Sequence, residues 1–341
     1  MTPYDSLPNT AFWKPAVAEA DPTALESLWQ PKFEISAQDL ILTAGSCFAQ
    51  NIGRQLRSRG LRWYESETPP ADLPRSQHEQ NGYGLFSFRT GNIYTAPLLL
   101  QWVQWALGTR KPDSEVWQAD DRFHDPFRPS ISVDGFRSAE EVLATRQRTL
   151  EAMLAAIRKA TLFIFTPGLT EAWVNCATSA VYPACPGTVK GRFDPERHEA
   201  RIFGYADCRD ALDKTLELLW SVNPGLKILL TVSPVPITAT ISGKHVLAAN
   251  FQTKNTLRTV VGEIADQYGR VDYFPSFELI GNPCSGARYF AQNGRTITEQ
   301  GIDAVMRHFF KATGSGSTTQ CVPTGEIICE DELLEYYAPL P

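Results

Sequence analysis

Short apolar runs of strand length alternate with helix-length segments along most of the chain, and this alternation constrains the fold most strongly. Runs typical of buried strands occur at residues 40–44, 161–166, 227–232 and 271–274. Strands that alternate with helices at intervals of tens of residues form parallel sheets with helices on both faces. We therefore predict an α/β fold with a central, mostly parallel sheet.

Apolar periodicity and end signals place the helices between these strands. The expected helices span residues 48–59, 97–107, 138–160, 207–222, 246–268 and 298–310. The first follows a Gly-Ser break and ends before Gly60, and the third begins with a Ser-x-x-Glu capping box at residues 138–141. The stretches 68–92, 121–135 and 173–206 are rich in loop residues, so we expect loops there.

The chain divides into three parts by composition. Residues 1–37 are rich in Pro and aromatic residues and lack periodicity, which predicts an extended lead packed on the domain. The α/β domain is expected at residues 38–312. Residues 313–341 begin with a flexible linker, GSGSTT at residues 314–319, and continue as a loosely tethered tail with acidic residues at 330–332.

Composition excludes several classes of protein. The 341 residues are 43% hydrophobic and 21% charged, so the chain can bury a sizeable core. The net charge of −6 disfavours nucleic-acid binding. No apolar run approaches the roughly 18–20 residues that span a bilayer, and the first residues do not resemble a secretory signal. We therefore expect a cytoplasmic protein.

The seven cysteines indicate neither a disulfide framework nor a metal site. None stands in a Cys-x-x-Cys motif, and the histidines lack zinc-ligand spacing. Scattered thiols in a chain without a leader are typical of reduced, mostly buried residues. We expect no metal and no cofactor.

Chemistry is expected where the strands end, because ligands of open parallel sheets bind outside the carboxyl ends of the strands. Ser46 follows the first strand and precedes a helix, where the helix dipole favours negative charge on its oxygen. It is therefore a candidate nucleophile, with a simple N-cap serine as the alternative. Cys47 at the same helix start is a rival nucleophile, since thiol pKa values fall at such positions.

Seven sequence blocks in order resemble the GSCFA family over roughly residues 38–312. They are GSCFA at 45–49, GNIYT at 91–95, DPFRP at 125–129, GLTEAW at 168–173, TVSPVP at 231–236, KNTLR at 254–258 and YFPSFE at 273–278. That family is grouped with the SGNH/GDSL hydrolases, which are esterases and acyltransferases. The resemblance implies a flavodoxin-like three-layer sandwich and a Ser nucleophile.

The resemblance also implies roles for particular residues. Ser46 lies in the nucleophile block with Gly45 and Cys47, and its N–H would be one oxyanion donor. The Gly91 N–H and the Asn92 side chain would supply further donors, although a simple turn is an equal alternative. Preorganised donors of this kind are often the largest catalytic term in acyl transfer.

Thr170 and Glu171 stand after the second strand, where the broader superfamily often carries an Asn. This departure weakens the case for a third oxyanion donor. Glu171 would instead orient a base or bind a substrate hydroxyl, with a carboxylate at a helix N-terminus as the alternative. Four cationic side chains are candidates for an anionic part of the substrate: Arg128, Lys254, Arg258 and Arg295.

The general base is missing from its expected place. The superfamily carries Asp-x-x-His near its C-terminus, whereas residues 293–296 here read Asn-Gly-Arg-Thr. A serine without a base is a weak nucleophile at neutral pH. Among five histidines, His245 follows the third strand and precedes a helix, so we hypothesise that it is the base. His124, beside Asp125 in a loop, is the second choice.

These features predict a serine-dependent esterase or O-acyltransferase acting on a carbohydrate or glycoconjugate. Its partners would be a small-molecule or carbohydrate substrate and an acyl donor, and the carbohydrate preference rests on the superfamily resemblance. The missing Asp-x-x-His motivates an alternative, a non-catalytic glycan- or metabolite-binding protein on the same scaffold. A Cys47 thiol enzyme is a third possibility, which requires a depressed thiol pKa.

Overall fold

The computed structural model describes residues 2–21, 25, 27–315 and 327–338. Its centre is a four-stranded parallel sheet in the order β1 (Ile41–Gly45), β4 (Leu162–Thr166), β8 (Lys227–Leu230) and β9 (Val271–Tyr273). All four strands match the apolar runs of the sequence within about two residues at either end. The prediction of an α/β fold with a central parallel sheet is therefore confirmed.

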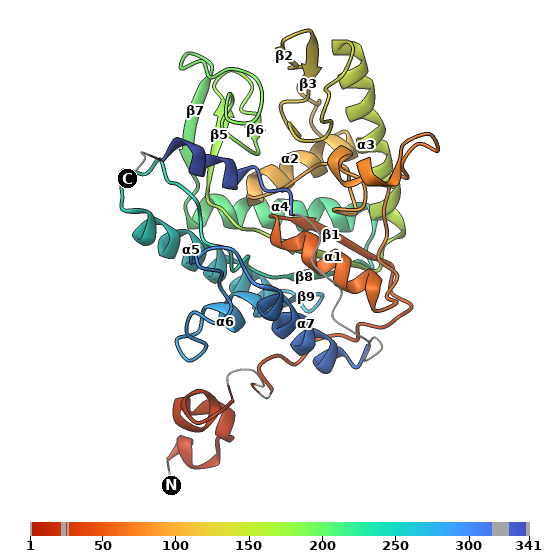
Figure 1. Ribbon diagram of the computed structural model, residues 1–341. Helices are drawn as coiled ribbons and strands as arrows, with labels where there is room; N and C mark the ends of the chain where they lie inside the picture. The colour runs from red at the N-terminus through yellow and green to blue at the C-terminus, as the bar shows by residue number, and fades with distance from the viewer. Residues whose placement is uncertain (1, 22–24, 26, 316–326, 339–341) are drawn as a thin grey trace.

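Helices cover both faces of this sheet and complete three layers (Figure 1). One face packs against α2 (Ala96–Leu107), α3 (Ala139–Lys159), α4 (Tyr205–Val222) and α5 (Val246–Gln267), and the other against α1 (Phe48–Ser58), α6 (Ser276–Gly281) and α7 (Glu299–Thr313). Neighbouring strand residues point to opposite faces, so Leu42 joins the first core and Ile41 the second. The layers agree with the predicted three-layer sandwich.

The helices begin and end where local chemistry allows. Phe48, Ile52 and Leu56 form the buried face of α1, and Gly60 beyond its end adopts a left-handed φ of 81°. The Thr95 hydroxyl caps α2 by accepting from the Leu98 N–H at 3.3 Å. Each large apolar side chain buried in this way stabilises the fold by roughly 1.5–3 kcal/mol.

Two of the expected loops contain short strands. The region 173–206 folds with its flanks into an antiparallel sheet in the order β6 (Val181–Tyr182), β5 (Glu171–Asn175) and β7 (His198–Ile202). A hairpin of β2 (Trp117–Ala119) and β3 (Arg122–His124) lies at the start of the other loop. These strands have two to five residues and carry many polar side chains, so they lack the apolar runs that reveal buried strands.

The N-terminal lead differs from the extended, packed segment that we expected. Residues 2–15 are exposed and coil into short turns, Pro3–Ser6, Asn9–Ala11 and Lys14–Ala18, which stand away from the domain (Figure 1). The packing expected of the lead begins only near its end. There the Trp29 ring lies 4.9 Å from the Phe274 ring, with Leu25 and Ile35 buried nearby in sequence.

The end of the chain is bound to the domain rather than loosely tethered. Residues 327–338, here called the closing segment, include the short helix η6 (Asp331–Tyr337), and Glu330 is only 2% exposed. In Figure 1 this segment runs in dark blue along the edge of the domain near β5 and β6. Residues 316–319 of the expected linker lie outside the described residues.

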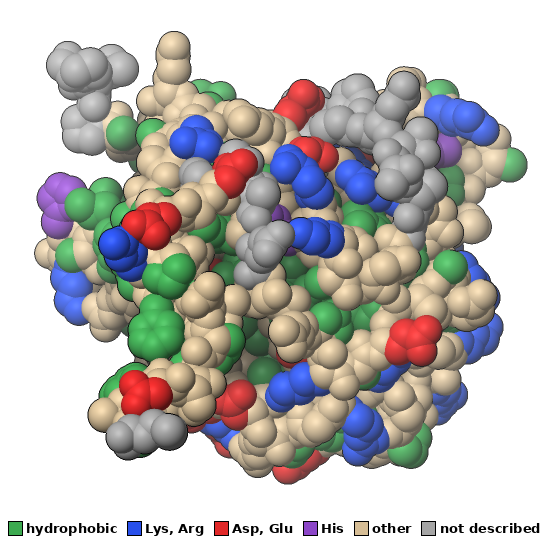
Figure 2. Space-filling model, turned by 90° about the horizontal axis from the view of Figure 1, so that it is seen from below, with side chains coloured by type: hydrophobic (Ala, Val, Ile, Leu, Met, Phe, Trp, Pro, Cys, Tyr) green, Lys and Arg blue, Asp and Glu red, His purple; other side chains and the backbone are tan. Residues whose placement is uncertain are grey.

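Within the described residues, no helix has the length and apolar character needed to cross a bilayer. On the face shown in Figure 2, Lys and Arg side chains are interspersed with acidic and hydrophobic ones.

Candidate active site at the carboxyl edge of the sheet

Ser46 lies at the carboxyl edge of the central sheet, directly after β1. Gly45 before it has a φ of +144°, and a Cβ there would lie 2.5 Å from the Thr166 carbonyl oxygen, so only glycine fits. The Ser46 side chain is buried, and its Oγ has no hydrogen-bond partner among the described residues. A buried hydroxyl without a partner costs about 1–3 kcal/mol, which marks this position as a candidate functional site.

The backbone of Ser46 does not supply the expected oxyanion donor. Its N–H donates to the Thr166 carbonyl oxygen at 2.9 Å and so extends the pairing of β1 with β4. The expectation that the Ser46 N–H is an oxyanion donor is therefore wrong, because this N–H is already bonded to Thr166.

Gly168, after β4, and Ser233, after β8, lie against Ser46. A Cβ on Gly168 would come within 3.0 Å of the Ser46 Cβ and 3.4 Å of both the Ser46 Oγ and the Ser233 Cβ. The carbonyl oxygen of Gly168 accepts a 2.8 Å hydrogen bond from the Nζ of Lys254 on α5. The ends of three strands and one helix therefore meet around the serine.

Lys254 is fully buried in this cluster. Burial lowers the pKa of its ammonium to about 8, because the charged form loses its hydration, while the Asp331 carboxylate partly opposes this shift. A lysine with a pKa near 8 is deprotonated often enough at neutral pH to accept a proton. The sequence marked Lys254 only as a candidate for binding anions, whereas the structure places it beside the candidate nucleophile through Gly168.

Asn92 provides a buried amide on the other side of the site. Ile93 N–H donates to the Gly45 carbonyl oxygen at 2.8 Å and so fixes this loop to the end of β1. The Asn92 Nδ2 donates at 3.0 Å to the carbonyl oxygen of Ile328 and also to the carboxylate of Glu330, both in the closing segment. Gly91, with a left-handed φ of 68°, leaves space next to the same carboxylate.

Glu330 is a buried carboxylate held by neutral donors. Besides Asn92, the Tyr94 hydroxyl donates to its Oε2 at 3.0 Å. Burial raises the pKa of Glu330, and these hydrogen bonds partly oppose the rise. The Asn92 amide, which the sequence assigned to an oxyanion, is thus occupied by oxygen atoms of the protein's own C-terminal region.

Cys47 and Cys329 form a pair of thiols beside the serine. The neighbouring Cys329 thiol, followed by burial, raises the pKa of Cys47 well above its usual range. Cys47 is therefore a neutral thiol, which contradicts the depressed pKa that a Cys47 nucleophile requires. On the other side, the Arg295 guanidinium lies 3.9 Å from the Cys329 sulfur and 2.7 Å from the Asp331 carboxylate.

Thr170 and Glu171 do not contact the serine oxygen. The Thr170 hydroxyl is paired with that of Thr253 at 2.9 Å, and Glu171 accepts from the Thr240 hydroxyl at 2.6 Å and the Ile241 N–H at 3.0 Å. Glu171 begins strand β5, so the alternative of a carboxylate at a helix N-terminus is wrong. It instead positions the loop after β8.

The structure does not bring a histidine to Ser46. His245 is exposed at the start of α5, where its Nδ1 accepts from the Leu247 N–H at 3.2 Å as an N-cap. His124 is buried in β3, and burial lowers its pKa. The Ser46 Oγ has no partner among the described residues, so neither histidine is hydrogen-bonded to it, and Lys254 reaches the serine only through its bond to Gly168.

The other cationic candidates belong mostly to ion pairs. Arg128 is buried and lies 2.7 Å from Asp125, and Arg258 pairs with Glu278. Among the residues that the structure covers, no group of three or more His, Cys, Asp or Glu is arranged to hold a metal ion.

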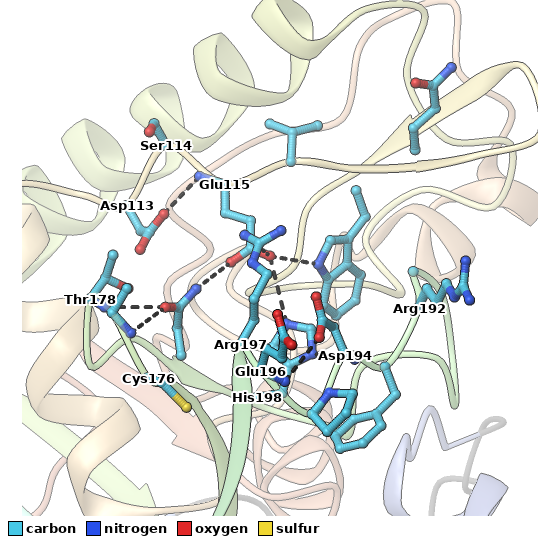
Figure 3. Close-up of a pocket in the computed structure, with 18 residues that line it drawn as sticks. Asp113, Ser114, Glu115, Cys176, Thr178, Arg192, Asp194, Glu196, Arg197 and His198 are labelled. Carbon is cyan, nitrogen blue, oxygen red and sulfur yellow. Dashed lines mark hydrogen bonds and ion pairs between the residues drawn. The ribbon is translucent and has the colours of Figure 1, made fainter.

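A larger hollow lies elsewhere, among the loops around β2 and β7 (Figure 3). Its volume is about 1120 Å³, and it shares no lining residue with the cluster around Ser46. Its central carboxylate, Glu115, accepts hydrogen bonds from Asn175 and Trp117, both at 3.1 Å, and His198 accepts from the Asp194 N–H at 3.0 Å. These groups hold neighbouring loops together, so we place the candidate site at Ser46 despite the smaller space there.

A smaller, mostly apolar cavity of about 190 Å³ adjoins the closing segment. Glu330 and Asp331 form part of its wall, together with Thr170 and Glu171. The apolar part is lined by Leu169, Trp173, Ile237, Ile241 and Leu334. This cavity beside Glu330 suits a hydrocarbon group.

A comparison with protein families decides the family. The model of the GSCFA family matches residues 40–309. The chain belongs to the GSCFA family. This GSCFA protein carries Ser46, Asn92 and Lys254 within the matched region, whereas the closing segment lies beyond it. A search among curated proteins finds no match.

The sequence of this GSCFA protein did not predict that three residues belong to the site: Tyr94, Cys329 and Glu330. Tyr94 stands in the GNIYT block, where its aromatic ring suits sugar stacking or loop packing, but nothing in the sequence pairs its hydroxyl with Glu330. Cys329 and Glu330 follow a linker-like stretch more than 280 residues after Ser46, and no local pattern indicates that they return to β1.

Proposed function

We propose that this protein is a serine-dependent esterase or O-acyltransferase with Ser46 as its nucleophile. The observation that carries the proposal is the buried, unpartnered Oγ of Ser46 at the carboxyl edge of the sheet and the start of α1. The helix N-terminus favours the developing negative charge on this oxygen. The GSCFA resemblance to SGNH hydrolases supports the same assignment.

Lys254 replaces His245 as our proposed base. Neutral Lys254 would take the proton of Ser46 as its Oγ attacks the acyl carbonyl carbon. The proton would then pass to the departing alcohol, leaving an acylated serine. Water or a sugar hydroxyl would release the acyl group in a second step. The Ser46 and Lys254 side chains both lie against Gly168, which supports this pairing.

Asn92 is our proposed oxyanion donor. Its amide already holds a carbonyl oxygen and a carboxylate oxygen of the closing segment, the same types of acceptor that a tetrahedral intermediate presents. The apolar cavity beside Glu330 suits the acyl chain, and Trp173 in its wall suits stacking against a sugar ring. The proposal of a carbohydrate or glycoconjugate acceptor rests on the superfamily resemblance.

A fluorophosphonate probe tests the nucleophile directly. We expect labelling of the wild type, no labelling of Ser46→Ala, and labelling of Lys254→Met slowed by about 10²-fold or more, since a general base contributes about that much. His245→Ala is the matched control and should label like the wild type. The Glu330→Ala variant opens the donor side and should label faster.

The alternative of a non-catalytic glycan- or metabolite-binding protein makes a different prediction. If neither the wild type nor Glu330→Ala reacts with the probe, the esterase proposal is wrong. Binding of glycans without turnover would then favour the alternative. Slow labelling of His245→Ala together with normal labelling of Lys254→Met would instead return the base to His245.

A further inference from the structure

The closing segment is held beside the candidate site by the side chains of two adjacent residues near its start, Glu330 and Asp331. Asn92 and Tyr94 hold Glu330, as described above. Asp331 accepts hydrogen bonds from Arg295 at 2.7 Å and from the Thr238 hydroxyl at 2.8 Å. The segment therefore covers the donors that a substrate would need, and a substrate reaches them only when these polar contacts open.

Cys47 and Cys329 join this segment to the element that carries the nucleophile. Cys47 immediately follows Ser46 at the start of α1, and Cys329 immediately precedes Glu330. Both side chains line one small cavity of about 40 Å³, together with Arg295, and each thiol shifts the pKa of the other. The two thiols are therefore neighbours across this cavity.

We propose that Cys47 and Cys329 are a redox-active pair whose disulfide locks the closing segment over Ser46. This inference rests on the proposed function of Ser46. In the reduced protein the segment leaves the site by breaking hydrogen bonds and one ion pair. In the oxidised protein the bond tethers it to the residue next to the nucleophile.

The environment of Cys329 suits it to react first. The Arg295 guanidinium and the Tyr94 hydroxyl lie 3.9 and 3.7 Å from its sulfur, and both stabilise a thiolate. The Cys47 thiol, the Arg295 charge and the Tyr94 hydroxyl lower the pKa of Cys329 against the opposing effects of burial and of the Asp331 carboxylate. Cys329 is partly exposed and Cys47 is buried, so Cys329 is the more accessible of the two residues.

A peroxide completes the chemistry in two steps. The Cys329 thiolate attacks one oxygen of hydrogen peroxide, and with one proton this gives a sulfenic acid and water. The Cys47 thiol then attacks the Cys329 sulfur, forming the S–S bond and releasing a second water. The two thiols are oxidised by two electrons and the peroxide is reduced by two. A dithiol reductant reverses the change.

The disulfide is detected by peptide mapping of the full chain. After treatment with hydrogen peroxide and blocking of free thiols, a protease that cuts after Glu releases residues 35–65, with Cys47 as the only cysteine, and residues 327–330, with Cys329. Cleavage at Glu326 separates Cys329 from Cys321, so the two are distinguished. The cross-linked pair of peptides is expected in wild type and in the control Cys321→Ser, and not in Cys329→Ser.

Labelling of Ser46 by the fluorophosphonate then measures closure. We expect oxidation to slow labelling of wild type and Cys321→Ser at least tenfold, dithiothreitol to restore it, and Cys329→Ser to be unaffected. Absence of the Cys47–Cys329 peptide pair overturns the proposal. So does a disulfide that leaves the labelling rate unchanged.

Failure of the proposed function is distinguished by hydrogen exchange. If reduced wild type and Glu330→Ala do not label at all, Ser46 is not an activated nucleophile. Closure is then read from amide exchange in residues 91–95, which hold the segment. Slower exchange after oxidation supports the lock, and unchanged exchange overturns it.

Discussion

At the scale of single residues, the candidate site depends on two glycines that allow close approach. A Cβ on Gly45 would lie only 2.5 Å from the Thr166 carbonyl oxygen, so glycine is needed there. Gly168 leaves room for the Ser46 side chain. A methyl group at either position would displace the serine or its neighbours. The serine is therefore positioned by backbone contacts, and its Oγ remains free of partners among the described residues.

The titration of Lys254 gives a prediction at this scale. Since burial lowers its pKa to about 8, Lys254 is charged and unable to accept a proton well below that pH. The rate of Ser46 labelling should therefore rise as the pH increases through about 8 and level off above it. Lys254→Met should be slow and lack this rise, as measured by probe kinetics from pH 6 to 10.

A wild-type rate that is flat across this range would contradict the role of Lys254. His245→Ala is again the control, because the His245 ring caps α5 at the surface and should leave the profile unchanged.

At the scale of elements, the closing segment carries a buried acid into the site. Glu330 is held by Asn92 and Tyr94, and burial raises its pKa, so the folded protein favours the protonated carboxyl. The pKa of Glu330 is higher in the folded protein than in the unfolded chain. At pH values between the two, the folded protein therefore binds more protons than the unfolded chain. Its contribution to stability is therefore present at low pH and is lost as the pH rises through the folded pKa.

Glu330→Gln removes the free-energy cost of ionising this buried carboxyl at high pH. The amide oxygen can still accept from Asn92 and Tyr94, so we expect the variant to be more stable than wild type at pH 8, where the buried carboxyl of wild type is driven to ionise. The difference should vanish near pH 4. Thermal unfolding of both proteins at several pH values measures it, and Glu332→Gln, beyond the buried carboxylate, is the control. Equal stability at pH 8 would contradict the prediction.

Elements of different character were predictable to different degrees. The four central strands were predicted from short apolar runs, and the long helices from apolar periodicity and caps. Both are signals that burial leaves in the local sequence. The β5–β7 sheet was missed because strands such as His198–Ile202 alternate few apolar residues. Ser46 and Asn92 were found in sequence blocks, whereas Lys254 and Glu330 gain their roles from burial and long-range contacts that no local pattern encodes.

At the scale of the whole molecule, the two ends of the chain differ in how they join the domain. The first turns stand in solvent, while the lead is anchored near its end by Trp29, whose ring stacks on Phe309 at 5.7 Å and whose Nε1 donates to Asp272 at 3.1 Å. The closing segment is instead embedded in the site.

This contrast predicts different costs of removal. Deleting residues 1–20 should change the free energy of unfolding by less than about 0.5 kcal/mol, because most of them are exposed. Trp29→Ala should cost about 2–3 kcal/mol, somewhat below a fully buried aromatic, since the ring is half-buried. Urea unfolding of the three proteins compares them. A deletion as costly as Trp29→Ala would show that the first turns do pack on the domain.

Because the closing segment follows the rest of the site in the sequence, it is also synthesised after it. The strands, α1 and Lys254 emerge from the ribosome before residues 327–338, so the nucleophile and its neighbours can assemble while the site is still open. Translation of the segment that holds Glu330 is then the step that covers them. A nascent chain halted before residue 327 would therefore present an uncovered serine.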